Sequence, residues 1–343
     1  MIGYQFFWQK VLTATAVTLT VGFGSISGAI AQSFTGAGAT FPEPLYRRYF
    51  REYQEEKQKE QTDVKFKYSA IGSGGGIRRF LNQSVDFGAS NVIPTPVERN
   101  SMKRGLLMVP TAGGSLAVVY NLQGITTDVK LSRETLGKIF TGQISNWKQV
   151  NSRLPNRKIQ VVVHSGSSGT SFIFTKYLNE ITNGRIRASK RPNWGFKVFS
   201  SVPGNAAVAS EVRRIDGAIG YVPASYAKQL NLPMARLENR AGRYVKPTVD
   251  QANKALGNVQ FNEDFTIENI DDPEQGYPIV GITWLFLYEK YPKPELAQGV
   301  KDLINWILTE GQDLNEDLQY TRIPEDVANR AIEAVNNNIR VVP

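Results

Sequence analysis

The 343-residue chain contains no cysteine and a single histidine, His164. The lack of cysteine excludes a disulfide framework, thiolate zinc sites, iron–sulfur clusters and a cysteine nucleophile. It also excludes a lipoprotein anchor, which needs an acylated cysteine after the signal peptide. One histidine is too few for the histidine-based sites that hold catalytic zinc. We therefore expect neither a metal nor a cofactor.

Long apolar runs are absent beyond residue 31, so we expect no membrane-spanning segment in the rest of the chain. Residues 1–31 differ, because Lys10 precedes a largely apolar stretch that ends in the small-x-small sequence Ala29-Ile30-Ala31. This layout is typical of a cleavable secretory signal peptide. The alternative is a membrane anchor. The glycines and serines within the stretch make it only weakly apolar for a membrane-spanning helix. We expect a mature chain that begins near Gln32 and works as a soluble periplasmic protein.

The composition is otherwise that of a globular chain, with 41% hydrophobic and 21% charged residues over a length of about two domains. A net charge of +9 raises the possibility of nucleic-acid binding. The basic clusters are short, however, and acids such as Glu52 and Glu55 interleave with Arg47, Arg48 and Arg51. This pattern indicates solvated faces, so we expect no nucleic-acid partner.

Strand and helix patterns alternate along the mature chain, which favours α/β layers around sheets with many parallel strands. We expect strands at 34–40, 64–71, 85–90, 107–109, 116–120, 159–163, 218–222 and 282–288. We expect helices through 45–53, 77–81, 132–140, 174–181, 206–214, 300–310 and 324–337. The polar stretch 241–272 is expected to form surface excursions.

Three segments rich in glycine, serine or threonine join a strand to a helix, namely Thr40-Phe41, Ile71–Gly76 and Val163–Thr170. A helix N-terminus exposes unpaired N–H groups and a partial positive charge. Glycine lets an anion approach the backbone, and a hydroxyl adds a further donor. If the three junctions converge, they form a cage of neutral donors for an oxyanion. The alternative is that Thr40, Ser73 and Ser168 are plain N-caps and the glycines are turn residues.

Catalytic and nucleotide-binding motifs are missing. Gly72–Gly76 lacks the lysine of a P-loop, the dinucleotide fingerprint is absent, and Gly166–Thr170 lacks the last glycine of a hydrolase elbow. His164 lies near four serines, but no acid nearby would orient it, and a structural role is the alternative. With one histidine and no cysteine, a phosphatase would lack both a metal set and an activated nucleophile. We expect the protein not to be an enzyme.

Six motifs then occur in a characteristic order and spacing. They are Thr35–Pro42 (TGAGATFP), Ile71–Gly76 (IGSGGG), Asp86–Ser90 (DFGAS), Thr135–Phe140 with Trp147, Ser168–Phe172 (SGTSF) and Gly217–Val222 (GAIGYV). In these motifs the chain resembles the periplasmic phosphate-binding proteins of the phosphate ABC transporter, the PstS family, and within it the SphX-like branch. The resemblance covers nearly all of the mature chain.

The resemblance implies a two-lobe periplasmic-binding-protein fold of type II, in which each lobe is a mixed sheet flanked by helices. Two chain crossings would join the lobes, near Leu116–Tyr120 and Ile282–Tyr288. Lobe I would comprise residues 32–117 and 285–343, and lobe II residues 118–284. The implied monomer captures inorganic phosphate, or a similar oxyanion, in the cleft between the lobes and closes by a hinge motion. It would then deliver the anion to a membrane permease.

The resemblance also implies a ligand set of Thr40, Phe41, Ser73, Ser168, Gly169 and Thr170. At three charged positions this chain departs from the family. Asn91 replaces the aspartate that accepts the proton of hydrogen phosphate, His164 replaces an arginine that binds the anion, and Gly166 replaces the aspartate that partners this arginine. We include Asn91 and His164 in the expected site.

The exchange of an aspartate for Asn91 bears on specificity. A buried carboxylate rejects an oxyanion that carries no proton, such as sulfate, whereas an amide offers both a donor and an acceptor. We therefore expect phosphate to bind with weaker discrimination against sulfate or a similar oxyanion such as arsenate. The alternative is that Ser165 or Ser167 and His164 rebuild a phosphate-specific site, in which a protonated His164 would tighten binding at low pH.

Overall fold

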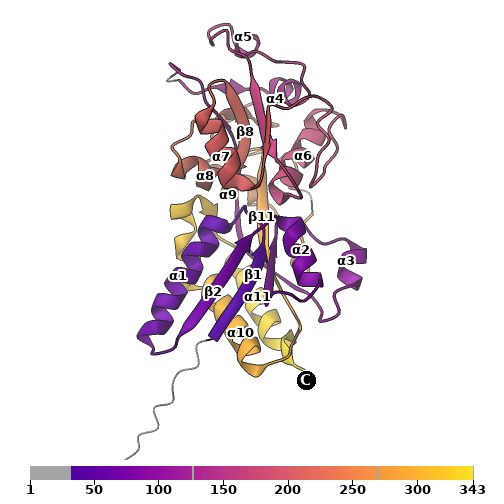
Figure 1. Ribbon diagram of the computed structural model, residues 1–343, viewed down its shortest axis with the longest axis vertical. Helices are drawn as coiled ribbons and strands as arrows, with labels where there is room; N and C mark the ends of the chain where they lie inside the picture. The colour runs from indigo at the N-terminus through magenta and orange to yellow at the C-terminus, as the bar shows by residue number, and fades with distance from the viewer. Residues whose placement is uncertain (1–31, 126, 269, 343) are drawn as a thin grey trace, which may run out of the picture.

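The computed structural model describes residues 32–125, 127–268 and 270–342, so the expected signal peptide, residues 1–31, lies outside the described residues. The elements form two lobes, one above the other in Figure 1, each with a sheet flanked by helices. One long sheet runs through both lobes in the strand order β2-β1-β3-β11-β4-β8-β6-β7, and β13 pairs with β4. The expected mixed α/β fold with two lobes is confirmed.

The lower lobe in Figure 1 contains both ends of the described chain. Strand β1 pairs in parallel with β2 and β3, and β11 is antiparallel to both β3 and β4. The strands are β1 (Gln32–Gly38), β2 (Val64–Ala70), β3 (Phe87–Ser90), β4 (Leu107–Tyr120), β11 (Val280–Leu287), β12 (Lys290–Tyr291), β13 (Tyr320–Thr321) and β14 (Arg340–Val341). The helices are α1 (Glu43–Lys59), α2 (Ser73–Leu81), α3 (Pro96–Asn100), α10 (Pro294–Leu308), η1 (Glu310–Leu314), η2 (Glu316–Leu318) and α11 (Glu325–Asn338).

The upper lobe continues the sheet from the second half of β4. Strand β8 is antiparallel to β4, and β6 is parallel to both β8 and β7. The strands are β5 (Lys130–Leu131), β6 (Gln160–His164), β7 (Ser200–Val202), β8 (Ala218–Pro223), β9 (Arg236–Glu238) and β10 (Tyr244–Val245). The helices are α4 (Arg133–Phe140), α5 (Trp147–Val150), α6 (Gly169–Ile181), α7 (Gly204–Arg214), α8 (Ala224–Gln229) and α9 (Val249–Leu256), the last of which lies near the junction of the lobes.

Strand β4 is a single strand of 14 residues, so the prediction of two separate strands at 107–109 and 116–120 is wrong. Pro110 and Gly113-Gly114 suggested a break. Pro110 lies beside a register shift of one residue, as at a β-bulge: it pairs with Trp284, and the next residue, Thr111, has no partner on β11. Proline is tolerated in sheets next to such irregularities. Gly113 is required by close packing, since a Cβ there would lie 2.6 Å from the Thr321 hydroxyl oxygen. The uninterrupted strand carries the chain from one lobe into the other.

Segment 249–268 is more ordered than the expected surface excursion. Its helix α9 buries Ala252 and Ala255 against β4, β11 and β13. Further along, Arg99 of α3 pairs with Asp264 at 2.8 Å, and the Trp284 indole of β11 donates to the Phe265 carbonyl at 2.8 Å. A part of residues 118–284, the range expected for lobe II, therefore packs against elements of the lower lobe.

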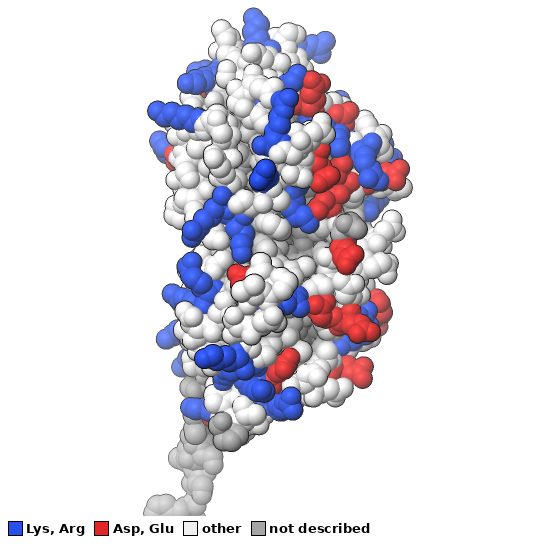
Figure 2. Space-filling view, turned by 90° about the vertical axis from the view of Figure 1, so that its right-hand side faces the viewer, with Lys and Arg blue, Asp and Glu red and all other residues white. Residues whose placement is uncertain are grey.

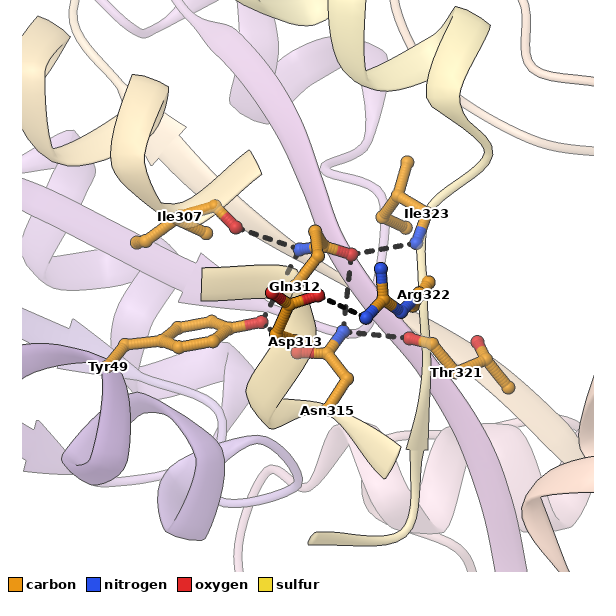
Figure 3. Close-up of polar contacts among 8 residues, drawn as sticks. All are labelled: Tyr49, Ile307, Gln312, Asp313, Asn315, Thr321, Arg322 and Ile323. Atoms are coloured by element: carbon orange, nitrogen blue, oxygen red, sulfur yellow. Dashed lines mark hydrogen bonds and ion pairs between the residues drawn. The ribbon is translucent and has the colours of Figure 1, made fainter. Parts of the chain in front are cut away.

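A buried amide network fastens the C-terminal segment to the sheet (Figure 3). Gln312 donates to the Thr111 and Ile307 carbonyls at 3.1 and 2.9 Å and accepts from the Ile323 N–H at 2.9 Å. Asn315 accepts from the Tyr49 hydroxyl and donates to the Thr321 carbonyl. Because these amides are buried, the loss of one hydrogen-bond partner would cost about 1–3 kcal/mol. The network therefore holds β13, with Tyr320, in register on β4.

The helices follow the apolar periodicity of the sequence. In α1 the buried side chains are those expected from the spacing, including Leu45, Tyr49 and Tyr53. Helix α10 begins at Pro294, six residues before the expected start at 300, because Pro294 occupies the first turn, where its missing N–H costs nothing. The IGSGGG segment also differs from the expected loop, since Ser73–Gly76 form the first turn of α2.

The two signs of charge are unevenly distributed on the face shown in Figure 2. Figure 2 shows Lys and Arg along the left of the view and most Asp and Glu on the right, with both signs between them. The basic cluster of α1 is paired within its own helix, Arg47 with Glu43 at 2.7 Å and Arg48 with Glu52 at 2.8 Å. These pairs fit the solvated faces expected from the sequence. Within the described residues no helix is long and apolar enough to cross a membrane.

Candidate functional site

The turn after β1 is held by three tyrosines. Each of three successive carbonyls accepts a hydrogen bond from a phenol: Ala39 from Tyr68 at 2.7 Å, Thr40 from Tyr226 at 2.8 Å and Phe41 from Tyr320 at 2.7 Å. A trans peptide is planar, and its N–H points opposite to its C=O. Tyr68 and Tyr226 therefore fix the direction of the Thr40 and Phe41 N–H groups, which point away from the two phenols.

Helix α6 presents its N-terminus to the cleft. Ser168 is the N-cap, and its hydroxyl accepts from the Ser171 N–H at 3.1 Å, so the N-cap alternative is correct for this serine. The N–H groups of Gly169 and Thr170 lie in the first turn, where helix geometry leaves them without an intrahelical acceptor. They can therefore donate to an anion.

Glycines allow the two lobes to meet at this point. The Gly74 N–H, in the first turn of α2, donates to the Ser167 carbonyl across the cleft at 3.4 Å. A Cβ on Gly74 would lie 2.1 Å from the Ser167 hydroxyl oxygen, and a Cβ on Gly169 would lie 2.2 Å from that of Ser73. Only glycine leaves room for this approach, which brings the α2 and α6 N-termini together.

Ser73 and Asn91 are adjacent on the lower lobe. Ser73 does not cap its own helix, since Gly72 is the N-cap of α2, and its hydroxyl accepts from the Asn91 backbone N–H at 3.1 Å. The Asn91 side-chain amide donates to the Ile282 carbonyl at 2.9 Å, whereas its Oδ1 is buried without a partner. The amide thus has a free acceptor oxygen and uses one of its two N–H groups within the protein, so the expectation that it offers both a donor and an acceptor stays a prediction.

Asn205 is a residue that the sequence reasoning missed. It lies in the first turn of α7, is fully buried, and donates to the Thr40 hydroxyl at 2.9 Å and to the Thr170 hydroxyl at 3.2 Å. It therefore joins two of the expected site residues, one from each lobe. The signal was present, because Pro203-Gly204-Asn205 follows a strand and opens a helix as the other three junctions do.

The four hydroxyls of the expected site share one arrangement. Each accepts a hydrogen bond from a protein N–H: Thr40 and Thr170 from Asn205, Ser73 from Asn91, and Ser168 from Ser171. A hydroxyl has a single proton, so each of them keeps that proton for a ligand. The site is in consequence a set of neutral donors.

His164 ends β6 and is 5% exposed. Neither ring nitrogen has a hydrogen-bond partner among the described residues, and the ring lies 5.2 Å from that of Tyr221. Burial lowers the pKa of His164 to about 4. The imidazole is therefore neutral near neutral pH in this structure, and the alternative that a protonated His164 replaces the missing cation stays a prediction.

A cavity of about 380 Å³ opens between the lobes. Thr40, His164 and Ser168 line it, together with Ala70, Ile71, Gly72, Ser165, Gly166, Ser167, Pro203 and Gly204, and none of these carries a carboxylate, ammonium or guanidinium. The other expected site residues do not line this cavity, namely Phe41, Ser73, Asn91, Gly169 and Thr170. The Phe41 ring is buried against Tyr320. In the part of the chain that the structure describes, no cluster of His, Asp and Glu could hold a metal ion.

The fold and this donor-lined cleft define a two-lobed binding protein. Residues 24–310 match the model of the PBP superfamily domain. Phosphate-binding proteins PstS of Haemophilus influenzae and Pasteurella multocida are 34% and 32% identical to this chain, over 89% and 92% of it and 92% and 94% of their own lengths. The chain therefore belongs to the PstS family of phosphate-binding proteins, as the six motifs predicted.

Solved structures agree with this fold. A high affinity periplasmic phosphate-binding protein with bound phosphate has a TM-score of 0.75 at 22% identity, covering 88% of this chain and 94% of its own. A phosphate-binding protein of Stenotrophomonas maltophilia has a TM-score of 0.72 at 19% identity, with the same coverage. The named relatives are binding proteins rather than enzymes.

Proposed function

We propose that this protein captures hydrogen phosphate in the cleft between its lobes and releases it to the membrane permease of an ABC transporter. The observation that carries the proposal is the set of four hydroxyls, each of which accepts a protein N–H and keeps its proton for a ligand. An anion gains the most from such donors, since bonds to charged groups contribute about 1.5–3 kcal/mol each against about 1 for neutral pairs.

The ligand residues in this proposal are Thr40, Phe41, Ser73, Asn91, His164, Ser168, Gly169 and Thr170. Backbone N–H groups and hydroxyls hold the phosphate oxygens, and Asn91 Oδ1 accepts the proton of hydrogen phosphate. Sulfate has no proton to give to this oxygen. The buried acceptor would then stay unpaired at a cost of about 1–3 kcal/mol, which corresponds to a preference for phosphate of about 5- to 150-fold.

The wider proposal concerns the whole molecule. The leader 1–31 directs the chain to the periplasm, where it works as a monomer that binds and releases its ligand without chemical change. The lobes comprise residues 32–117 with 285–343 and residues 118–284, apart from segment 249–268, which lies against the first lobe. The proposed ligand groups are neutral N–H and hydroxyl donors, so the anion is held without a lysine, arginine or protonated histidine.

Titration calorimetry with phosphate, arsenate and sulfate at pH 6 and pH 8 tests the proposal. We expect phosphate and arsenate to bind, and sulfate to bind more weakly by the factor given above. A preference over sulfate of more than about 10³-fold, or about 4 kcal/mol, would show that discrimination is not weakened. The absence of phosphate binding would refute the function itself, and release of product from a chromogenic phosphate ester would reveal an enzyme instead.

A further inference from the structure

The net charge of the chain is concentrated in one stretch of the upper lobe. Residues 135–210 contain 11 of the 40 Lys and Arg but only one of the 31 Asp and Glu, namely Glu180. This stretch therefore carries a formal charge of +10, and the remaining residues together carry −1, which accounts for the total of +9. It includes most of α4 and all of α5, β6, α6 and β7, so the charge belongs to one lobe.

Ion pairs neutralise only a part of this charge. Lys138, Arg157, Lys176 and Lys190 each pair with an acid. The other seven cations of the stretch are exposed and form no ion pair with any residue that the structure describes, namely Lys148, Arg153, Lys158, Arg185, Arg187, Arg191 and Lys197. None of the seven is a proposed phosphate ligand or lines the cavity between the lobes, so the proposed function leaves this charge unused.

Three of the unpaired cations lie on one loop at the end of the upper lobe. An antiparallel bridge between Asn146 and Lys158 closes this loop, which contains α5 and carries Lys148, Arg153 and Lys158. Helix α5 lies at the top of Figure 1, on the side of the upper lobe that faces away from the lower lobe. The loop therefore presents its charges at an end of the molecule, remote from the contact between the lobes.

Two further cations lie beside the same end. Lys158 and Lys197 line a hollow of about 450 Å³ together with residues 142, 144 and 145, and Arg185 lines one of about 410 Å³ together with residues 141 and 143. The two hollows thus flank the turn 141–145. We call Lys148, Arg153, Lys158, Arg185 and Lys197 the basic patch. Figure 2 shows mostly Lys and Arg at the upper end of the molecule, in agreement with this grouping.

An exposed aromatic ring accompanies the charges. Phe199 is 52% exposed and lines the same hollow as Lys158 and Lys197. At a bilayer surface a phenyl ring enters the boundary between headgroups and acyl chains, while neighbouring lysines keep their ammonium groups among the headgroups. Anionic headgroups also move laterally, so they can pair with cations that come from separate segments without a fixed match in shape. An anionic lipid surface is therefore the partner that satisfies both the charges and the ring.

We propose that the basic patch, with Phe199, attaches the protein peripherally to an anionic lipid membrane. The inference goes beyond the proposed function, since the patch lies outside the cleft and shares no residue with the phosphate site. Each cation near such a surface increases partitioning about fivefold, which corresponds to about 1 kcal/mol. The attraction reaches about 10 Å at 0.1 M salt and about 3 Å at 1 M, so the attachment weakens as salt rises.

Vesicle flotation tests the attachment. The protein used begins at Gln32, so it contains every described helix and strand and lacks the apolar leader, which could itself enter a bilayer. We expect binding to vesicles of phosphatidylcholine with about 40% phosphatidylglycerol, none to phosphatidylcholine alone, and partitioning at least about tenfold weaker at about 0.5 M than at about 0.05 M salt. Equal binding to the two compositions, or binding to neither, overturns the proposal. Binding of a polyglutamate peptide without binding to vesicles also overturns it and assigns the patch to an acidic protein segment.

A pair of double variants locates the surface. Lys158→Gln with Lys197→Gln removes two charges of the patch, whereas Lys59→Gln with Lys103→Gln removes two exposed charges of the lower lobe. We expect the first to weaken partitioning about 25-fold and the second by less than about twofold. Equal losses would show that net charge acts without a defined surface and overturn the proposal. Phosphate affinity should stay within about twofold in both, so a failure of the attachment is distinguishable from a failure of the proposed function.

Discussion

Tyr226 reaches from α8 in the upper lobe to the Thr40 turn of the lower lobe. Its hydroxyl donates to the Thr40 carbonyl at 2.8 Å and lies 3.1 Å from a Glu43 carboxylate oxygen. Burial, followed by the Glu43 charge, raises its pKa far above the usual range, so it remains a donor at any working pH. We expect Tyr226→Phe to weaken phosphate binding although Tyr226 does not contact the ligand.

The size of the effect follows from the contact that is lost. When the lobes are in contact, the Thr40 carbonyl in Tyr226→Phe keeps only the long bond from the Glu43 N–H at 3.4 Å, and the loss of the phenol costs about 1–3 kcal/mol. When the lobes separate, water can satisfy the same carbonyl. The cost thus falls on the closed state alone, and the phosphate Kd should rise by about 5- to 150-fold, mostly through faster release.

Calorimetry and stopped-flow release of phosphate measure this effect. Tyr244→Phe serves as the matched control, because the Tyr244 hydroxyl makes no hydrogen bond to the described residues and the ring lies in β10, in contact with Lys130. A Tyr226→Phe protein whose Kd stays within about twofold of the parent would refute the idea that this phenol couples lobe contact to the Thr40 turn.

Three other predictions concern the site. Asn91→Asp restores a carboxylate at the free acceptor, and we expect it to weaken sulfate by at least about tenfold relative to phosphate; an unchanged ratio in competition calorimetry contradicts the role of Oδ1. The pKa of His164 is lowered to about 4 in the folded protein, so the unfolded chain binds the extra proton between pH 6.5 and 4. Stability should fall by about 3 kcal/mol over this range, and urea unfolding should show a smaller fall in His164→Gln, whereas equal falls would refute the assignment. Gly169→Ala places a Cβ 2.2 Å from the Ser73 hydroxyl oxygen and should weaken phosphate by about 5- to 150-fold, in contrast to Gly257→Ala at a helix end outside the cleft; equal affinities would contradict the close approach of the lobes.

Much of the fold could be predicted because its signals are local. The strand-to-helix junctions at Thr40, Ser73 and Ser168 were visible as glycine, serine and threonine between an apolar strand and an amphipathic helix. The continuity of β4 was not visible, since Pro110 and the adjacent glycines carry the local pattern of a break. The strand continues because β11 pairs with it along its first half, and the Thr321 hydroxyl packs where a side chain at Gly113 would lie.

The proposed site also contains residues that the sequence could predict and residues that it could not. Six of its expected ligand residues came from motifs in which neighbouring residues carry the information, whereas Asn205, Tyr226 and Tyr320 act on residues more than 30 positions away in sequence. No periodicity reports such contacts, because they depend on where the lobes bring distant segments together.

For this protein the sequence alone determined which donors the proposed site offers: backbone N–H groups and hydroxyls at strand-to-helix junctions, with His164 and Asn91 at positions where the family has charged side chains. The tertiary structure decided how those groups are used. Asn205 turns two hydroxyls into donors, the Ile282 carbonyl accepts one N–H of the Asn91 amide and leaves its oxygen free, and burial keeps His164 neutral. The physical reason is that a single residue determines which donor groups it carries. The direction of those groups, their unused hydrogen-bonding atoms and their charge depend on neighbours that only folding supplies.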